Sequence, residues 1–277
     1  MGSTTPRWVR RWVLGRWSVA RLGRSLLIIY VVVTLYVFFT ADSKIFLPPT
    51  SSYAQLPGLV TVPINAVNGH QLAVLHLPNP SADYSLLYSH GNAEDLGLIR
   101  PVLDVLHSAG VSVVSYDYSG YGLSTGKSSE QQSYRDITAV YRYMVDDLGI
   151  PSDRILIHGR SVGGGPSLYL ATQQPSAGLI LESTFTSAFR VLLPIPIFPF
   201  DKFPNRDRLR QLNLPVLIIH GEADDTISID HGRSLYEAAS DPKRSLWVPN
   251  ADHNDLVWVA GDDYVEAVRS FVASLSS

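Results

Sequence analysis

Short apolar runs recur along the chain between residues 59 and 248, and glycine, proline or polar residues bound most of them. Runs of this length that are rich in valine, isoleucine and leucine predict buried strands. Eight strands are expected, at residues 59–64, 71–77, 84–88, 111–116, 155–158, 178–182, 216–220 and 243–248. The dipeptide Asn68-Gly69 separates the first two and is the strongest short signal for a hairpin, so this first pair is expected to be antiparallel.

From the third run onward, segments with helical periodicity separate the strands. Residues 130–148 and 262–275 each carry apolar side chains on one helical face, and residues 96–108 and 231–239 are also expected to be helical. Strands that alternate with helices predict a mainly parallel sheet with helices on both faces. The fold class is therefore α/β, with eight mostly parallel strands.

The N-terminal pattern is of a different kind. Residues 25–41 are 17 uncharged and mostly apolar residues. As a helix they cover about 25 Å, slightly less than the ~30 Å hydrocarbon core, and residues 22–24 extend them. We expect an uncleaved transmembrane anchor. The alternatives are a cleaved signal peptide, which Phe38 and Phe39 disfavour because its cleavage site needs small residues, and a buried core helix.

The charge distribution supports the anchor. Residues 1–24 hold six arginines and no acidic residue, together with Trp8, Trp12 and Trp17, which suit a membrane interface. The positive-inside rule then places the N-terminus in the cytoplasm and the remainder of the chain across the membrane. That remainder has 16 basic and 25 acidic residues, a net charge of −9, which argues against a nucleic-acid partner.

A candidate nucleophile follows the fifth expected strand. Residues 159–163 read G-R-S-V-G, and a helical segment begins directly after them. G-x-S-x-G between a strand and a helix indicates a nucleophile elbow, a turn tight enough to need glycine on both sides of the serine. This predicts Ser161 as the nucleophile, with an ordinary glycine-rich loop as the alternative.

A serine hydroxyl needs a base, and the base needs an orienting carboxylate. In proteins with this elbow the chain order is serine, acid, histidine. His253, on a short polar loop after the last strand, is the expected base, since His220 ends a strand and His231 opens a helix. After the preceding strand stand Glu222, Asp224 and Asp225, of which Asp224 is the expected acid and Asp225 the alternative.

Two backbone N–H groups complete the candidate site. Elbow sites take one from the residue after the nucleophile, here Val162, and one from the loop after the third strand, here Asn92. His90 in that loop is expected to organise the loop rather than to react. Residues 187–215 form an insertion, in which the apolar, proline-stiffened stretch 192–200 either walls an acyl chain or only packs over the sheet.

With these motifs, the chain resembles the α/β-hydrolase superfamily. More narrowly, it resembles a small-capped, membrane-associated branch that includes animal protein depalmitoylases and fungal and plant polarity-related homologues. The matching segments are H-G-N-A-E-D at 90–95, D-Y-S-G-Y-G at 117–122, G-R-S-V-G-G at 159–164, F-T-S-A at 185–188, F-D-K-F-P at 200–204, H-G at 220–221 with Asp224, and H-N-D at 253–255. The resemblance implies an eight-stranded α/β-hydrolase fold with a short cap. It also implies a Ser161, Asp224 and His253 triad with an oxyanion hole at Asn92 and Val162. Depalmitoylases attach to membranes through an acylated, cysteine-rich N-terminus, whereas this chain has no cysteine.

The expected organisation follows from these patterns. A basic aromatic tail at 1–24 precedes the transmembrane anchor at 25–41, a tether at 42–54 and an α/β-hydrolase domain at 55–277 with its cap at 187–215. The expected function is hydrolysis of an ester or thioester, including lipid-like substrates that carry an acyl chain, at the membrane. No cofactor and no metal are expected. The alternatives are a peptidase or amidase on the same triad and a non-catalytic membrane scaffold.

Overall fold

A computed structural model describes residues 19–65 and 69–276. The chain divides into two compact units, residues 1–41 and residues 42–277. The three N-terminal tryptophans, the arginines before residue 19 and Asn68 of the expected hairpin turn lie outside the described residues.

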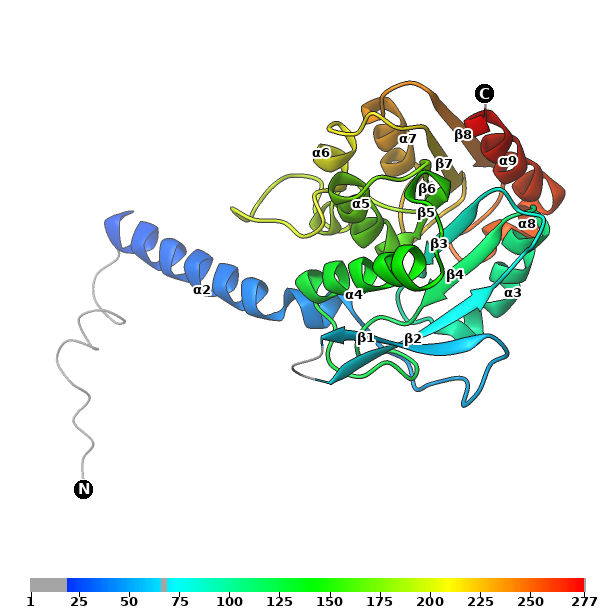
Figure 1. Ribbon diagram of the computed structural model, residues 1–277. Helices are drawn as coiled ribbons and strands as arrows, with labels where there is room; N and C mark the ends of the chain where they lie inside the picture. Colours follow the sequence, from blue (N-terminus) through cyan, green and yellow to red (C-terminus); the bar gives the residue numbers. More distant parts are fainter. Residues whose placement is uncertain (1–18, 66–68, 277) are drawn as a thin grey trace. The chain divides into compact units, whose positions relative to one another are not determined.

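The larger unit is built on one eight-stranded sheet (Figure 1). Its strand order is β1-β2-β4-β3-β5-β6-β7-β8. The strands are β1 (Leu59–Asn65), β2 (His70–Leu77), β3 (Ser85–Ser89), β4 (Ser112–Tyr116), β5 (Ile155–Arg160), β6 (Gly178–Glu182), β7 (Val216–Gly221) and β8 (Lys243–Val248). All eight expected strands are present within two residues of their expected bounds. The β1–β2 and β2–β4 pairs are antiparallel and every other pair is parallel, so the mostly parallel sheet is confirmed.

Helices cover both faces of the sheet, as the alternating pattern predicts. They are α3 (Leu96–Ser108), α4 (Glu130–Arg142), α5 (Gly164–Gln173), α6 (Asn205–Leu209), α7 (Ile229–Ala238), α8 (Leu256–Ala260) and α9 (Asp262–Ala273). The helix expected at 130–148 is α-helical only to Arg142 and continues as a π-helical turn over Tyr143–Asp147. Side-chain caps fix two helix starts: the carboxylate of Asp95 accepts the Leu98 N–H at 3.0 Å, and the hydroxyl of Ser129 accepts the Gln132 N–H at 3.1 Å.

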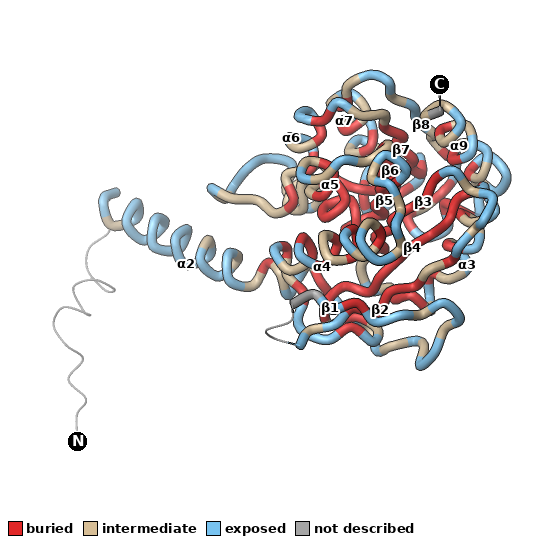
Figure 2. The backbone as a smooth tube through the Cα atoms, viewed as in Figure 1, coloured by how far each residue is buried: buried red, intermediate tan, exposed pale blue. Residues whose placement is uncertain are grey.

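Alternate residues of the central strands pack into two separate hydrophobic cores, one on each face of the sheet. On β5, Ile155 and Ile157 pack with α4 to α7, while Leu156 packs with α3, α8 and α9. This is the two-residue period of a strand buried on both faces. Figure 2 shows the result, a buried sheet between two layers whose outer surfaces are exposed. Because β3, β5, β6, β7 and β8 are parallel, the loops after them gather at one edge of the sheet.

The N-terminal helix α2 runs from Val19 to Ile45. It has 27 residues, about 40 Å at 1.5 Å per residue, and among residues 19–65 and 69–276 it is the one helix long and apolar enough to cross a membrane. Its most apolar window is not buried at all. The core-helix alternative is therefore wrong, whereas a membrane span and a signal sequence share these features.

The segment expected as a tether belongs to the larger unit. Phe46 is buried, with its ring 6.0 Å from that of Tyr118 and 6.1 Å from that of Phe203 between centroids. Farther along, the Ser52 N–H donates to Asp95 at 2.6 Å, which ties the segment to the start of α3. Residues 42–54 therefore pack along the larger unit.

Candidate active site

Ser161 lies on a sharp turn between β5 and α5. Its backbone φ is +53°, a left-handed conformation that serine rarely adopts and that marks local strain. Close approach explains the flanking glycines: a Cβ on Gly159 would lie 2.5 Å from the Gly163 carbonyl oxygen, and a Cβ on Gly163 would overlap the carbonyl of Ser89. The strand–turn–helix context that the motif predicts is present, and it sets Ser161 at the carboxyl edge of the sheet.

Three side chains from separate loops form a continuous chain of hydrogen bonds. The Nε2 of His253 lies 3.0 Å from the Oγ of Ser161, and the Nδ1 of His253 lies 2.8 Å from Oδ2 of Asp224. Each of the three residues is less than one-tenth exposed. The structure thus brings together the predicted nucleophile, base and acid, which follow β5, β8 and β7.

The surroundings of Asp224 keep it ionised. Burial alone would raise its pKa, but hydrogen bonds from His220 and His253 and from the Ile227 N–H hold the pKa well below its ordinary value of 3.8. The Ile227 N–H donates to Oδ1 at 2.7 Å and the Thr226 N–H at 3.0 Å. Oδ2 is therefore left to face the imidazole of His253.

The alternative residues occupy other positions. Asp225 is exposed, and its N–H donates to Asp252 at 3.1 Å. Glu222 is exposed as well. The Nδ1 of His231 lies 3.1 Å from the Thr186 hydroxyl, and burial, followed by the nearby charge of His220, lowers the pKa of His231. Among the described contacts, none of the three side chains bonds directly to Ser161 or His253; Asp225 and His253 only share Asp252, which accepts both of their N–H groups.

The loop after β3 is organised around the side chain of Asn92. Its Oδ1 accepts hydrogen bonds from the Tyr121 hydroxyl at 2.7 Å and from the Leu47 N–H at 2.8 Å. His90 is fully buried in the same loop with Nδ1 2.7 Å from the Gly91 carbonyl, in keeping with an organising role. Asn92 follows β3 and Val162 follows Ser161 directly, so both lie at the edge where the loops gather. Their N–H groups as oxyanion donors stay a prediction.

Arg160 is the residue that sequence reasoning missed. Its guanidinium pairs with Glu94 in the loop after β3, and it donates to the carbonyl of His253 at 2.8 Å. Its Nε also lies 3.4 Å from Glu182 at the end of β6. Glu94 in turn accepts the Gly91 N–H at 2.8 Å. Arg160 therefore joins the loops that carry Asn92, Ser161 and His253. The sequence did offer one signal for Arg160: a charged residue stands next to an elbow that is expected to be buried, and a buried guanidinium requires partners.

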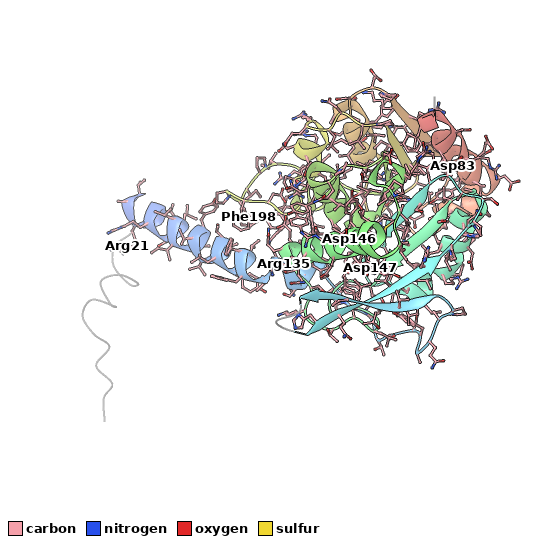
Figure 3. All side chains as sticks on the ribbon, in the orientation of Figure 1. Arg21, Asp83, Arg135, Asp146, Asp147 and Phe198 are labelled. Carbon is pink, nitrogen blue, oxygen red and sulfur yellow. The ribbon has the colours of Figure 1, made fainter. Side chains whose placement is uncertain are left out.

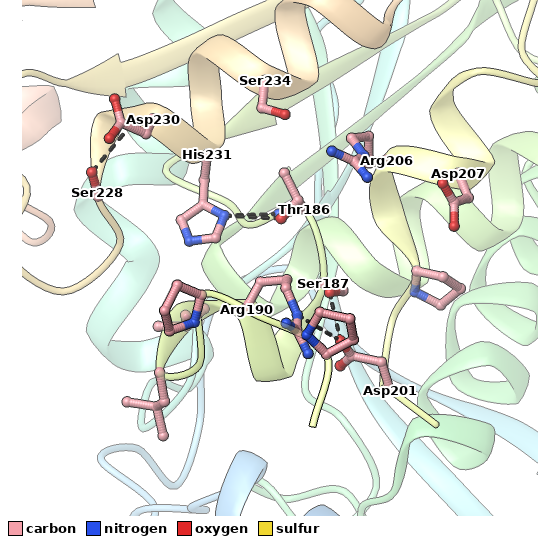
Figure 4. A pocket seen from close by; sticks show the side chains of 15 residues that line it. Thr186, Ser187, Arg190, Asp201, Arg206, Asp207, Ser228, Asp230, His231 and Ser234 are labelled. Carbon is pink, nitrogen blue, oxygen red and sulfur yellow. Dashed lines mark hydrogen bonds and ion pairs between the residues drawn. The ribbon is translucent and has the colours of Figure 1, made fainter. Parts of the chain in front are cut away.

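A cavity of about 660 Å³ lies under the cap, beside the loop after β6 (Figure 4). Thr186 and His231 line it together with Val191, Leu192 and three prolines of the cap. Asp201 closes the cap at its base, because its carboxylate accepts the Ser187 hydroxyl at 2.7 Å. Ser161 and His253 do not line this cavity, but the Thr184 hydroxyl, two residues before Thr186, donates to the Ser161 carbonyl at 2.6 Å. Within the described part of the chain, no group of three or more histidine and carboxylate residues is arranged to hold a metal ion.

The fold and this site define a class of protein: the chain is a member of the α/β-hydrolase superfamily. The family described as "Serine aminopeptidase, S33" matches residues 80–197. Human alpha/beta hydrolase domain-containing protein 17B is 42% identical over 173 residues, which cover 61% of this chain and 60% of that protein. Alpha/beta hydrolase domain-containing protein aho-3 of Caenorhabditis elegans is 41% identical over 163 residues, 58% of this chain and 49% of that protein. The matched region thus spans about half to three-fifths of each relative.

Solved structures confirm the fold over a longer stretch. An esterase of Pyrococcus furiosus superimposes with a TM-score of 0.70 at 18% sequence identity, covering 84% of this chain and 98% of the esterase. An esterase of Rhodococcus superimposes with a TM-score of 0.62 at 18% identity, covering 79% of this chain and 99% of that one. At this identity the likeness establishes the α/β-hydrolase fold.

Proposed function

We propose that the chain is a serine hydrolase that cleaves carboxylic esters or thioesters through an acyl-enzyme on Ser161. The observation that carries the proposal is the hydrogen-bond chain from Ser161 Oγ through His253 to Asp224, at 3.0 Å and 2.8 Å, on a strained elbow. A non-catalytic scaffold would need neither this alignment nor the backbone strain at Ser161, because both cost stability.

In the first half-reaction, Ser161 Oγ attacks the carbonyl carbon while His253 Nε2 takes the hydroxyl proton. The resulting imidazolium is stabilised by the ionised Asp224. The negative charge that develops on the carbonyl oxygen is assigned to the N–H groups of Val162 and Asn92, each worth about 3–4 kcal/mol of transition-state stabilisation in comparable sites. When the bond to the leaving group breaks, His253 returns the proton to the departing alcohol or thiol.

In the second half-reaction, water replaces the leaving group. His253 removes a proton from the water as its oxygen attacks the acyl carbon, and the same donors stabilise the tetrahedral intermediate. Collapse expels the Ser161 oxygen, which recovers its proton from His253. The products are a carboxylic acid and the free enzyme.

The cap supports an acyl-bearing substrate. Val191, Leu192 and three prolines of the cap give one part of the cavity an apolar lining for an acyl chain, while the other ten of its fifteen lining residues are polar or charged. Its volume lies in the range typical of small-molecule sites. The resemblance to protein depalmitoylases points to the same chemical class, a long-chain thioester or ester.

The description of the matching family as serine aminopeptidases supports a second candidate, hydrolysis of an amide bond on the same triad. The acylation chemistry is the same, but an amide has a poorer leaving group. Turnover of p-nitrophenyl esters of increasing chain length, compared with aminoacyl-p-nitroanilides, separates the two. Faster turnover of the anilides would favour the peptidase.

Labelling with a fluorophosphonate probe tests the nucleophile. The full chain should be labelled, and Ser161→Ala should lose both labelling and at least about a thousandfold of ester turnover. Ser167→Ala is the matched control, because Ser167 is also buried, on α5, and its hydroxyl has no hydrogen-bond partner among the described residues. Labelling that persists in Ser161→Ala, or is lost in Ser167→Ala, would contradict the proposal.

We also propose that α2 anchors the protein in a membrane through residues 25–41, with the N-terminus in the cytoplasm and residues 42–277 on the other side. The length and apolar character of this helix support the anchor. Six arginines lie before residues 25–41, whereas the ten residues after them carry one basic residue, Lys44, near Asp42, and this difference supports the orientation.

A further inference from the structure

The chain enters the larger unit beside the candidate active site. Asp42 pairs with Lys202 at the base of the cap at 3.1 Å, and it accepts the Glu130 N–H at 3.2 Å. Five residues after Ala41, Phe46 is buried against Phe203, and the next residue, Leu47, donates to Asn92 in the predicted oxyanion loop. The first residues of this unit therefore contact both the cap and the site.

The connection to the anchor is short. Residues 41 to 46 can span at most about 18 Å even when fully extended. If the membrane span ends at Ala41, Phe46 cannot lie farther than this from the bilayer surface, and Phe46 packs against Phe203 of the cap insertion. The amino ends of the strands lie at the other edge of the sheet. Figure 3 shows Phe198 of the cap and Asp83, which precedes β3, at opposite sides of this unit.

The cap presents apolar side chains to the outside. Leu192 is 84% exposed and Ile195 is 64% exposed, far more than large aliphatic residues of a covered loop. Three half-buried phenylalanines of the same loop contact one another, with the ring of Phe189 5.7 Å from Phe200 and 6.0 Å from Phe198. Prolines at 194, 196 and 199 stiffen the loop.

The charge around the cap also suits a membrane. Residues 42–277 carry a net charge of −9, whereas residues 188–210 hold five basic and two acidic residues; with Asp42 and Glu130, which pair with Lys202, this group has a net charge of +1. An exposed apolar tip beside arginine and lysine side chains is the pattern of a segment that rests in the headgroup region of a phospholipid bilayer.

We propose that the cap tip, residues 192–197, inserts into the surface of the bilayer that the chain crosses. This rests on the proposed membrane anchor. The insertion turns the carboxyl edge of the sheet toward the lipid, so that an acyl chain held in the membrane reaches the cap cavity without crossing bulk water.

Site-specific fluorescence on the full-length protein in anionic phospholipid nanodiscs tests the proposal. The chain has no cysteine, so Ile195→Cys and, as the control, Asp83→Cys each take one environment-sensitive NBD label. The label at position 195 should emit at shorter wavelength and be quenched by doxyl-labelled lipid, whereas the label at position 83 should be quenched by aqueous iodide. A label at 195 as accessible to iodide as that at 83 would overturn the docking. A label that is shielded from iodide but not quenched by lipid would overturn it too, because a protein surface would then cover the loop.

A second variant connects docking to activity. Ile195 does not line the cap cavity. Ile195→Asp should lower hydrolysis of a long-chain ester embedded in the bilayer by about fivefold or more, and leave hydrolysis of soluble p-nitrophenyl acetate unchanged. Equal activity on the embedded ester would count against the proposal. Absence of any esterase activity would refute the proposed function, while the fluorescence readout would still decide the docking.

Discussion

At the residue scale, the candidate site depends on how three loops present one side chain each. His253 is held between the hydroxyl of Ser161 and the carboxylate of Asp224, and Asp224 is itself fixed by two backbone N–H groups. Asp225, one residue farther along, faces solvent and Asp252 instead. Asp224 and Asp225 carry the same carboxylate group, but only that of Asp224 points at the imidazole of His253, and this orientation identifies the acid.

Exchange of each carboxylate for an amide measures this choice. Asp224→Asn should lower kcat for p-nitrophenyl acetate by about 10⁴-fold, because the amide no longer orients and stabilises the imidazolium. Asp225→Asn should change kcat by less than about threefold, since its carboxylate does not contact His253. A larger loss in the Asp225 variant would reverse the acid assignment.

The pH dependence of activity follows from the lowered pKa of Asp224. The folded protein keeps this carboxylate ionised below its ordinary value of 3.8, so Asp224 adds no step to the activity profile near pH 4. Above about pH 4, kcat/KM should therefore show no step that depends on the protonation of Asp224. Conversely, the stability that ionised Asp224 contributes is complete above its ordinary pKa and is lost only as the pH falls below it. Two resolved acidic steps in kcat/KM between about pH 4 and pH 8 would contradict this assignment.

At the scale of elements, parallel strands place the loops and a buried guanidinium joins them. Arg160 ends β5, contacts Glu94 after β3 and the His253 carbonyl after β8, and lies 3.4 Å from Glu182 on β6. Glu182 is fully buried and also accepts a hydrogen bond from the Tyr264 hydroxyl on α9 at 2.7 Å. The position of the His253 loop thus depends on Arg160, and we regard Arg160 as a positioning residue.

Replacement of Arg160 by lysine tests this role. Arg160→Lys keeps the charge but loses the planar fork that serves Glu94 and His253 together. We expect kcat to fall by about 10- to 100-fold with little change in KM, because the loss lies in the alignment of the base and not in substrate binding. Arg154→Lys, at the amino end of the same strand, is the matched control and should leave kcat unchanged. A loss confined to KM would contradict the positioning role.

At the scale of the whole molecule, the proposed anchor and the hydrolase residues occupy two separate compact units. The junction leaves little free chain, because Asp42 and Phe46 already belong to the packed larger unit. If residues 25–41 span a membrane as proposed, this short junction keeps the site close to the bilayer.

Membrane extraction and a topology reporter test the anchor. The full-length protein should stay in the membrane pellet after carbonate treatment, because transfer of 17 apolar residues from lipid to water costs far more than a pH change supplies. A phosphatase fused to the C-terminus should be active, since that enzyme works only outside the cytoplasm. Complete release by carbonate would refute the anchor. If the phosphatase fusion is inactive while a fluorescent protein fused to the same C-terminus fluoresces in the cytoplasm, the topology is the reverse of the one proposed. A mature N-terminus near Asp42 would favour a cleaved signal peptide.

The sequence by itself determined the local features of this protein. Periodicity and turn chemistry predict the eight strands, the elbow at Ser161 and the long apolar helix. Both signals depend only on residues within a few positions of one another. The order of serine, acid and base along the chain also limited the candidates to a few side chains.

Only the tertiary structure decided what depends on partners distant in the chain. Ser161 and His253 are 92 positions apart, and Arg160 and Glu94 are 66 apart. No local pattern encodes such contacts, since they arise when parallel strands bring their ends to one edge. The same holds for Asp224 over Asp225, and for residues 42–54, whose composition resembles a tether but whose Phe46 fills a gap between Tyr118 and Phe203. Burial and direction, the two quantities that separate these alternatives, exist only once the chain is packed.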